Sequence, residues 1–327
     1  MYLLHRIIFT GLIFISWELN AQVALPTFQG VQSVTQPSLY TFSSHTFTNC
    51  GETGRTGPTL ANCKSSYNTT WENDTDLFNV QTQGIQEWTV PQTGTYRIEA
   101  RGAQGGTLND GSLIAGKGAR IIGDFSLPMG TVLKILVGQQ GIGGSSGASG
   151  GGGGSFVTKS PHNSNASILV VAGGGGGTSG NTYAGLHGLT TTSGGTGGGA
   201  ATGYAGGTNG QGGANNSSTN STGGGGGFLT DGSSGGYWGS QRGYSYINGG
   251  AGGTSGSGGR VGGFGGGGGT HSNNTGGGPG GGYSGGGAGQ HSSNAVGGGG
   301  GSYNSGSSQS NTAGYNTGQG QVIITRN

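Results

Sequence analysis

Charged residues are scarce in this sequence, which has only 12 lysines and arginines and 10 aspartates and glutamates among its 327 residues. The net charge is +2, and the basic residues form no cluster along the chain. Proteins held to nucleic acid or to anionic membranes by electrostatics need a concentrated basic region. Neither binding mode is therefore expected to be the main function.

Long hydrophobic runs are missing as well. The longest apolar stretch, residues 7–17, is shorter than the roughly 18 residues that a membrane-spanning helix needs. It follows His5 and Arg6 and precedes Leu19-Asn20-Ala21, which is the arrangement of a secretory signal peptide. We therefore predict a signal peptide at residues 1–21 and a secreted, extracellular or cell-surface chain without membrane insertion.

Cysteine is limited to Cys50 and Cys63. Two thiols are too few for a structural zinc site, which has four ligands. In an exported protein the two are expected to pair, and the bridge would close a short loop and stabilise the fold by roughly 3 kcal/mol. We therefore predict a disulfide between Cys50 and Cys63.

Glycine is the abundant residue, and 80 of the 87 glycines lie in residues 101–327. This fraction is close to that of collagen, but the glycines do not recur at every third position and the chain has only 7 prolines, which excludes a triple helix. Five runs of five consecutive glycines occur at residues 150–154, 173–177, 223–227, 265–269 and 297–301. They form either a flexible linker or a structure in which the missing side chains allow close packing.

A polar and apolar alternation predicts strands on both sides of the glycines. Tyr96, Ile98 and Ala100 alternate with charged residues, which is typical of a half-buried strand. No part of the mature chain shows the 3.6-residue period of a helix, and residues 64–79 are predicted as a polar loop. The predicted fold class is therefore all-β. Further strands are predicted at residues 119–125, 132–137, 156–157, 168–171 and 321–325.

The strand predicted at residues 321–325 follows the glycine-rich region and would fix its far end to the same sheet structure. We predict an extended N-terminal arm at residues 22–45 and a single glycine-rich domain at residues 46–327. The parts of this domain are a β-sandwich from residues 46–172 and 318–327 and polyglycine-rich insertions mainly at 141–154 and 173–317.

A glycine run can be ordered when neighbouring runs satisfy its backbone groups. In polyproline II geometry five residues span roughly 15 Å, and without Cβ atoms such runs can bond N–H to C=O and add Cα–H contacts. Each bond contributes about 0.5 to 1.5 kcal/mol, whereas ordering one residue costs about 1 to 2 kcal/mol. One run alone would stay disordered, whereas a bundle whose interior residues each make two or more contacts can order.

Several motifs add to this argument from composition. The most specific are Trp88-Thr89-Val90-Pro91 and Ile135-Leu136-Val137-Gly138-Gln139-Gln140-Gly141. Others are Cys50-Gly51, Gly57-Pro58-Thr59 with Cys63, Gly84-Ile85-Gln86, Thr95-Tyr96, Gly102-Ala103-Gln104-Gly105-Gly106, Phe156-Val157, and the glycine runs at residues 150–154, 173–177 and 265–269. Together they resemble the extracellular glycine-rich domain of the anaplastic lymphoma kinase and leukocyte tyrosine kinase receptor family. The resemblance covers residues 46–327.

This resemblance implies a specific fold. In that family the domain is a tumour-necrosis-factor-like sandwich with an inserted bundle of polyglycine II helices, so a jelly-roll sandwich carrying such a bundle is expected here. The sequence departs from the receptors in showing no transmembrane helix, no growth-factor-like cysteine-rich module and no kinase domain. Signalling by phosphorylation is therefore not expected, and no ligand-contacting residue of the receptors is carried over.

No motif predicts an enzyme. Residues 111–118 differ from a phosphate-binding loop because Gly118 stands where a Ser or Thr must follow the lysine. The histidines are scattered without the spacing of metal ligands, and no carboxylate pair or nucleophile elbow is evident. We expect no catalytic residues, no cofactor and no metal.

One aromatic cluster interrupts the glycine-rich region. Its candidate recognition residues are Tyr237, Trp238, Arg242, Tyr244 and Tyr246. These residue types dominate binding hot spots, so the cluster could contact a glycan or a protein. Alternatively, the rings cover the side of the bundle or pack it against the sandwich, and the sequence leaves both interpretations open.

The sequence thus predicts a secreted, non-catalytic ligand-binding or adhesive module with a rigid polyglycine scaffold. Its partner would be an unknown extracellular protein or glycan. One alternative is a structural protein of an extracellular matrix or coat, in which the bundle only stiffens an assembly. Another is the ectodomain fragment of a receptor tyrosine kinase.

Overall fold

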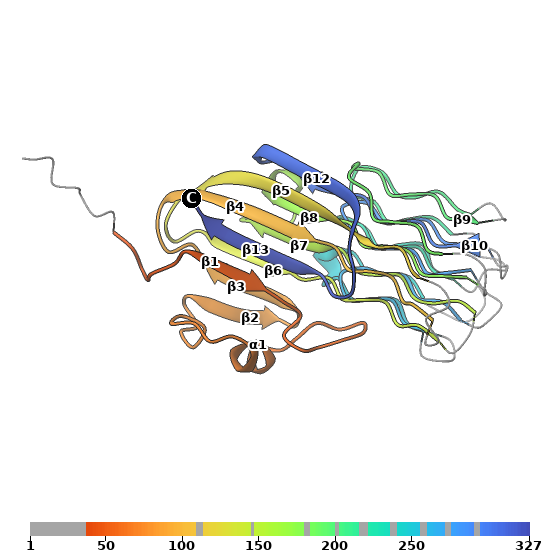
Figure 1. The fold of residues 1–327 in the computed structure, drawn as a ribbon, viewed down its shortest axis with the longest axis horizontal. Helices are drawn as coiled ribbons and strands as arrows, with labels where there is room; N and C mark the ends of the chain where they lie inside the picture. The colour runs from red at the N-terminus through yellow and green to blue at the C-terminus, as the bar shows by residue number, and fades with distance from the viewer. Residues whose placement is uncertain are drawn as a thin grey trace, which may run out of the picture. The chain divides into compact units, whose positions relative to one another are not determined.

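In the computed structural model, all described residues belong to one compact unit, Gln36–Asn327, and Figure 1 shows their fold. The predicted signal peptide and most of the predicted arm lie outside the described residues. The described ranges are 37–108, 114–144, 147–179, 184–199, 203–215, 222–235, 241–255, 260–271, 276–290 and 295–327.

The first sheet has five antiparallel strands in the order β1-β13-β4-β5-β12. Strand β13 lies between β1 and β4, where Val322 pairs with Phe47 on one side and with Ala100 on the other. The strand predicted after the glycine-rich region therefore does complete a sheet that residues before this region begin. The strand bounds are β1 Ser44–Phe47, β4 Gly94–Arg101, β5 Gly118–Leu127, β12 Ser307–Asn316 and β13 Gln321–Arg326.

The second sheet has six antiparallel strands in the order β11-β8-β7-β6-β3-β2. Their bounds are β2 Phe78–Thr82, β3 Ile85–Thr89, β6 Val132–Leu136, β7 Ser155–Lys159, β8 Ile168–Ala172 and β11 Tyr303–Asn304. A two-stranded pair, β9 Gly198–Gly199 with β10 Ala295–Val296, lies in the glycine-rich region. The all-β prediction is confirmed in a coarser form, since the described residues are mostly β with few helical segments.

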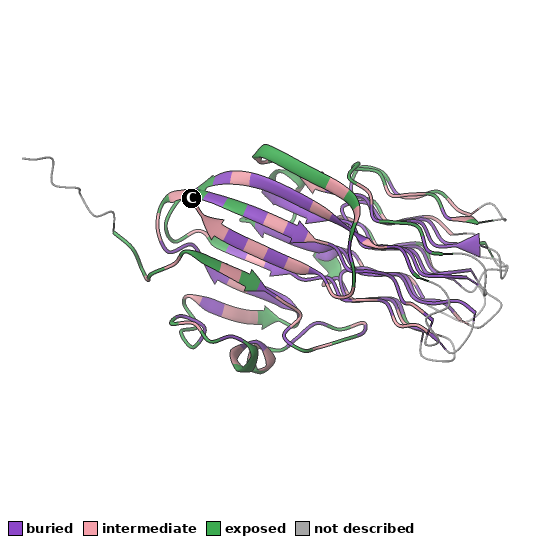
Figure 2. Ribbon diagram, in the orientation of Figure 1, coloured by how far each residue is buried: buried purple, intermediate pink, exposed green. Residues whose placement is uncertain are grey.

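One hydrophobic core joins the two sheets. Tyr96 and Ile98 of β4 are fully buried in the same cluster as Ile135 of β6 and Val157 of β7. Figure 2 shows an alternation of buried and more exposed residues along β4 and β13, which arises because successive side chains of a strand point to opposite faces. Each fully buried large apolar side chain contributes roughly 1.5 to 3 kcal/mol to the driving force for folding.

The polar loop predicted at residues 64–79 is partly wrong. Helix α1 spans Leu60–Ser66, and β2 begins at Phe78. Thr59 caps the helix, because its side chain accepts a hydrogen bond from the backbone N–H of Asn62 while the Asn62 side chain accepts one from the backbone of Thr59. A helix of seven residues is too short for its 3.6-residue period to be recognised in the sequence. Two 3-10 turns also occur, η1 at Asn165–Ser167 and η2 at Tyr246–Asn248.

The predicted disulfide between Cys50 and Cys63 is confirmed. It connects the residues after β1 to α1, and both sulfur-bearing side chains are buried. The loop between the two cysteines also contacts the glycine-rich region, since the carbonyl oxygens of Gly54 and Arg55 accept hydrogen bonds from the backbone N–H groups of Phe264 and Gly252.

The five glycine runs are packed rather than exposed. Every glycine in them is buried, and Figure 2 shows buried backbone along the glycine-rich segments. In Figure 1 these segments run side by side from one end of the sheets. Their N–H groups bond to carbonyl oxygens of segments far away in the sequence, as Gly152 does to Gly175 at 2.8 Å. The runs therefore satisfy one another's backbone groups, as an ordered bundle requires.

In several of the runs, the hydrogen-bond partners repeat every three residues. Gly151 donates to the carbonyl of Gly268, and Gly154 donates to that of Gly265, three residues along the same neighbouring segment. The same step of three links Gly150 and Gly153 to Ile142 and Gln139, and Gly174 and Gly177 to Gly281 and Gly278.

A second hydrophobic cluster attaches the glycine-rich region to the body. Four of its rings, those of Phe228, Tyr246, Phe264 and Tyr283, are buried against residues of the six-stranded sheet such as Phe156. These sheet residues alternate with those of the main core, so they lie on the opposite face of the sheet. The glycine-rich region is thus held by both its chain ends and by aromatic side chains between its runs.

Candidate functional site

The outer face of the five-stranded sheet carries a row of charged side chains. In β4 the buried residues alternate with Arg97, Glu99 and Arg101, and the pleat of the strand directs these three away from the core. Arg120 of β5 is the register partner of Arg101, so it lies on the same face. Two arginines are therefore neighbours across adjacent strands.

Two of the three arginines on this face are paired with carboxylates. Arg101 Nε lies 2.6 Å from Glu99 Oε1, and Arg97 Nη1 lies 3.6 Å from Asp124 Oδ1. Among the described residues, no carboxylate lies within ion-pair distance of Arg120. Its Nη2 instead donates to the hydroxyl of Thr312 at 3.3 Å, so its positive charge is left uncompensated.

The ring of Tyr315 lies close to the guanidinium groups of both neighbouring arginines. The guanidinium carbon of Arg120 is 4.2 Å from the centre of the Tyr315 ring, and that of Arg101 is 5.5 Å from it. Cations within about 6 Å of a ring centre are attracted by the ring's quadrupole. The ring is 42% exposed. We call Arg101, Arg120 and Tyr315 the arginine–tyrosine site.

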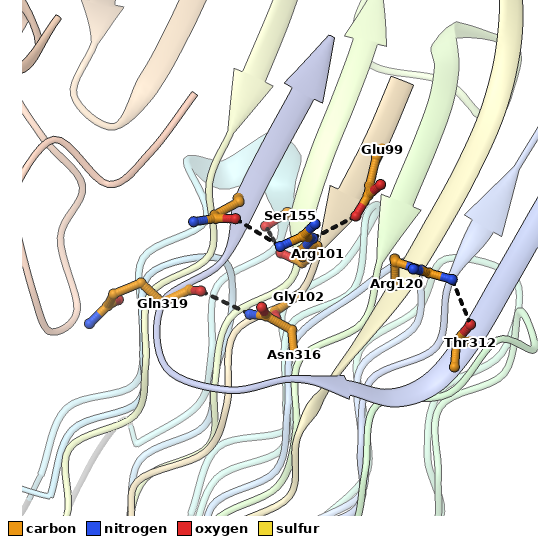
Figure 3. Close-up of polar contacts among 9 residues, drawn as sticks. Glu99, Arg101, Gly102, Arg120, Ser155, Thr312, Asn316 and Gln319 are labelled. Atoms are coloured by element: carbon orange, nitrogen blue, oxygen red, sulfur yellow. Dashed lines mark hydrogen bonds and ion pairs between the residues drawn. The ribbon is translucent and has the colours of Figure 1, made fainter. Parts of the chain in front are cut away.

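A polar network fixes the backbone beneath this site, as Figure 3 shows. The hydroxyl of Ser155 donates to the carbonyl of Arg101 at 2.7 Å. The buried side chain of Asn316 donates to the carbonyls of Gly102 and Gln319, both at 2.8 Å. Asn316 follows Tyr315 directly, so these bonds anchor the backbone next to the exposed ring.

The arginine–tyrosine site offers positive charge and hydrogen-bond donors, which are the groups that suit acidic ligands. A guanidinium stays protonated throughout the physiological range and cannot exchange protons with a substrate, but it donates up to five hydrogen bonds to carboxylate, sulfate or phosphate oxygens. No group of three or more His, Cys, Asp or Glu side chains is placed to hold a metal ion in the described part of the chain. None of the helices described is long and apolar enough to cross a membrane.

The predicted aromatic cluster is only partly described. Tyr237 and Trp238 lie outside the described residues. Arg242 Nε lies 3.7 Å from Asp231 Oδ2, and its guanidinium carbon lies 5.4 Å from the centre of the half-buried Tyr244 ring.

Tyr246, the last residue of that cluster, is only 4% exposed. It stacks on Phe228 with ring centres 5.1 Å apart, and burial raises the pKa of its hydroxyl. Its position matches the packing interpretation of the cluster. A recognition role for the other members stays a prediction.

The sequence did not point to Tyr315. Strand β12 is a polar edge strand, so its residues show no apolar alternation that would predict a strand. Of the two arginines, only Arg101 belongs to the alternation of β4. The approach of Tyr315 to both depends on the pairing of β12 with β5, which joins residues about 190 positions apart. A search for an isolated aromatic residue among polar ones would have been the only local signal.

The chain is similar to the leukocyte tyrosine kinase receptor of Mus musculus. The two are 36% identical over 121 residues, which are 37% of this chain and 14% of the receptor. The chain thus matches a domain-sized part of that protein and no kinase region. No protein-family model matches the chain. The resemblance noted in the sequence is confirmed for the part that aligns.

Proposed function

We propose that this chain is a secreted, non-catalytic module that binds a ligand or adheres to a surface, with its glycine-rich region as a rigid scaffold. Its similarity to part of a receptor supports a binding role outside the cell. The disulfide between Cys50 and Cys63 supports export, because such bonds persist mainly in oxidising compartments.

In this proposal the two sheets form a tumour-necrosis-factor-like jelly roll, and the glycine runs are polyglycine II helices. A helix of that kind has three residues per turn, so residues three apart face the same neighbour. The hydrogen bonds of Gly151 and Gly154 to one segment follow this step. An α-helix would repeat at 3.6 residues and a strand at two.

Rigidity follows from how closely the runs approach. A Cβ atom on Gly153 would lie 1.7 Å from the carbonyl oxygen of Phe264, and one on Gly175 would lie 1.8 Å from that of Gly116. Such backbone contacts are possible only for glycine. With neighbours on several sides, each residue gains enough hydrogen bonds and weak Cα–H contacts to offset the entropy lost on ordering.

The observation that carries the binding role is the exposed Tyr315 ring beside Arg101 and the carboxylate-free Arg120. Tyrosine and arginine are enriched among the residues that dominate binding energy. The buried Asn316 anchors the backbone beside the ring, which reduces the entropy that would be lost when a partner binds. The partner is expected to present an acidic group on an extracellular protein or glycan.

Binding of the full chain to immobilised acidic peptides and acidic polysaccharides tests this role by surface plasmon resonance. We expect saturable binding to at least one of them, weakened tenfold or more by Tyr315→Ala and by Arg120→Gln. Arg97→Gln is the matched control, because Arg97 is an arginine on the same face whose charge Asp124 already balances. It should change the affinity only slightly.

The matrix or coat alternative predicts a different result. Fibres or insoluble sheets that grow with protein concentration, without saturable binding to any probe, would favour it and overturn the binding role. Equal losses of affinity in Arg97→Gln and Arg120→Gln would show that general charge attraction, rather than the arginine–tyrosine site, holds the ligand.

A further inference from the structure

A small cavity of about 190 Å³ lies on the six-stranded sheet, away from the strands that carry the arginine–tyrosine site. Its walls come from the loop after β7 and from η2, which bring His162 and Asn163 opposite Ile247. Lys134 and Ile85 of the sheet complete it. Sites that enclose drug-sized molecules measure roughly 300 to 1,000 Å³, so this cavity has room for one small ring.

A chain of hydrogen bonds orients the imidazole of His162. Its Nδ1 lies 2.9 Å from the hydroxyl of Thr158, which in turn lies 2.8 Å from the buried hydroxyl of Tyr246. A buried hydroxyl without an acceptor is costly, so Tyr246 donates to Thr158 and Thr158 donates to Nδ1. The proton of the neutral ring is then on Nε2, which is a donor for a molecule in the cavity.

The charges around the cavity balance. Lys134 Nζ lies 3.3 Å from Glu87 Oε1, so the one lysine or arginine among the described residues of the wall already has a carboxylate beside it. Burial, and to a smaller extent Lys134, lower the pKa of His162, so its imidazole is neutral at physiological pH. A charged ligand would therefore gain no net attraction here.

The wall combines polar groups of both kinds with apolar surface. Lys134 and His162 donate hydrogen bonds, while the Asn163 amide and the Thr82 hydroxyl can both donate and accept. Ile247 is 44% exposed and forms an apolar wall. Vicinal hydroxyls on a ring with C–H faces match this combination, because each hydroxyl donates and accepts while the ring carbons cover the isoleucine.

We propose that this cavity binds a neutral hexose ring, such as the terminal residue of a glycan, with its hydroxyls on Lys134, His162 and Asn163 and its C–H face against Ile247. Affinity for a single ring is expected to be weak, because one ring makes few contacts. A glycan presented in many copies would bind more tightly through avidity.

Titration of the isotope-labelled chain with the methyl glycosides of glucose, galactose and mannose tests this by NMR. At least one should shift the amide signals of residues around the cavity in a saturable way. Asn163→Ala and Ile247→Ala should each weaken binding about tenfold or more. The matched controls Asn68→Ala and Ile114→Ala remove exposed side chains of the same types elsewhere and should leave it unchanged.

His162→Asn provides a further variant in case Asn163→Ala or Ile247→Ala disturbs the fold. His162 has a φ of +67°, which asparagine tolerates better than most residues, so this change removes the imidazole with little backbone strain. It should weaken binding while the unfolding midpoint stays constant. The proposal is overturned if none of the three glycosides causes saturable shifts at the cavity, or if only glucuronic acid, which adds a carboxylate, does so.

Discussion

A Cβ atom on Gly267 would lie 2.3 Å from the carbonyl oxygen of Gly151, which belongs to another glycine run. This oxygen is part of the backbone and cannot rotate away as the end of a flexible side chain would. Gly267→Ala should therefore push two runs apart and lower the free energy of unfolding by more than about 1 kcal/mol, since overpacking a close-packed interior costs typically 1 to 3 kcal/mol. Urea unfolding followed by tryptophan fluorescence measures the effect.

Gly195→Ala is the matched control for that substitution. A Cβ atom on Gly195 would lie no closer than 3.3 Å to any neighbour, although Gly195 also lies in the glycine-rich region. Because its nearest contact is only slightly tighter than an ordinary one, the unfolding midpoint should fall much less than in Gly267→Ala. If the two variants had the same midpoint, the runs could not be packed as closely as the structure shows.

The disulfide allows a second prediction about stability. Cys50 and Cys63 are 13 positions apart in the sequence. Closing a loop of this size lowers the conformational entropy of the unfolded chain, which stabilises the folded state by about 3 kcal/mol. Replacing both cysteines by alanine should lower the free energy of unfolding by that amount. The parent chain unfolded with a reducing agent is the control and should reach a similar midpoint, whereas unaltered stability in both would show that the bond contributes little.

Sequence pattern predicted the strands that have one buried and one exposed face. In β4 the alternation of Tyr96 and Ile98 with charged residues gave the correct element, because burial on one side of a strand imposes a period of two. The final strand was recognised for a similar reason, since its apolar residues need a core and no disordered tail would keep them. Its neighbours β1 and β4 could not be derived locally, because pairing over more than 200 positions depends on the whole topology.

The candidate site was harder to predict than the fold. Residue type alone indicates the aromatic cluster that includes Tyr244 and Tyr246, but Tyr246 turns inward to stack on Phe228, so residue type does not reveal exposure. No sequence pattern indicates Tyr315, because it lies in a polar edge strand, where water satisfies one side and no apolar pattern is required. Both outcomes depend on tertiary contacts that no local pattern contains.

A pH-dependent stability is predicted from His45. Its ring packs edge-on against Phe47, Tyr67 and Trp71, with ring centres 4.6 to 4.9 Å away. Burial lowers the pKa of His45 to about 4, against a partial opposing effect of Glu72. The unfolded chain, with a pKa of about 6.5, therefore takes up a proton that the folded chain does not. Stability is complete above pH 6.5 and falls as the pH decreases toward 4.

Unfolding in urea at pH 7.5 and at pH 5 measures this effect. The decrease between these pH values should be about 1 to 2 kcal/mol, with allowance for the partial exposure of the ring. His45→Phe keeps an aromatic ring without a titrating nitrogen. In this variant the free energy of unfolding should no longer show the part of the decrease between pH 7.5 and pH 5 that comes from His45. Glu72 has a lowered pKa, so its own effect on the free energy of unfolding begins only at more acidic pH. A lower limit of pH 5 keeps that effect out of the test. An identical decrease in both proteins would show that His45 is not its source.

Asn316 connects the exposed ring of Tyr315 to the base of the glycine-rich region, and its replacement should affect both stability and binding. Its amide nitrogen donates to the carbonyls of Gly102 and Gln319, and the residue is only 8% exposed. Asn316→Asp keeps the shape of the side chain but places an acceptor against two acceptors. We expect the free energy of unfolding to fall by about 1 to 3 kcal/mol, which is the usual cost of leaving buried polar groups unsatisfied.

Asn68→Asp makes the same change of charge at an exposed position and should leave the unfolding midpoint nearly constant. Because Asn316 sets the backbone beside Tyr315, Asn316→Asp should also weaken binding of an acidic probe at the arginine–tyrosine site, even where the chain remains folded. A variant with reduced stability but undiminished affinity for that probe would separate the two roles. It would show that Asn316 supports the fold without positioning the ring.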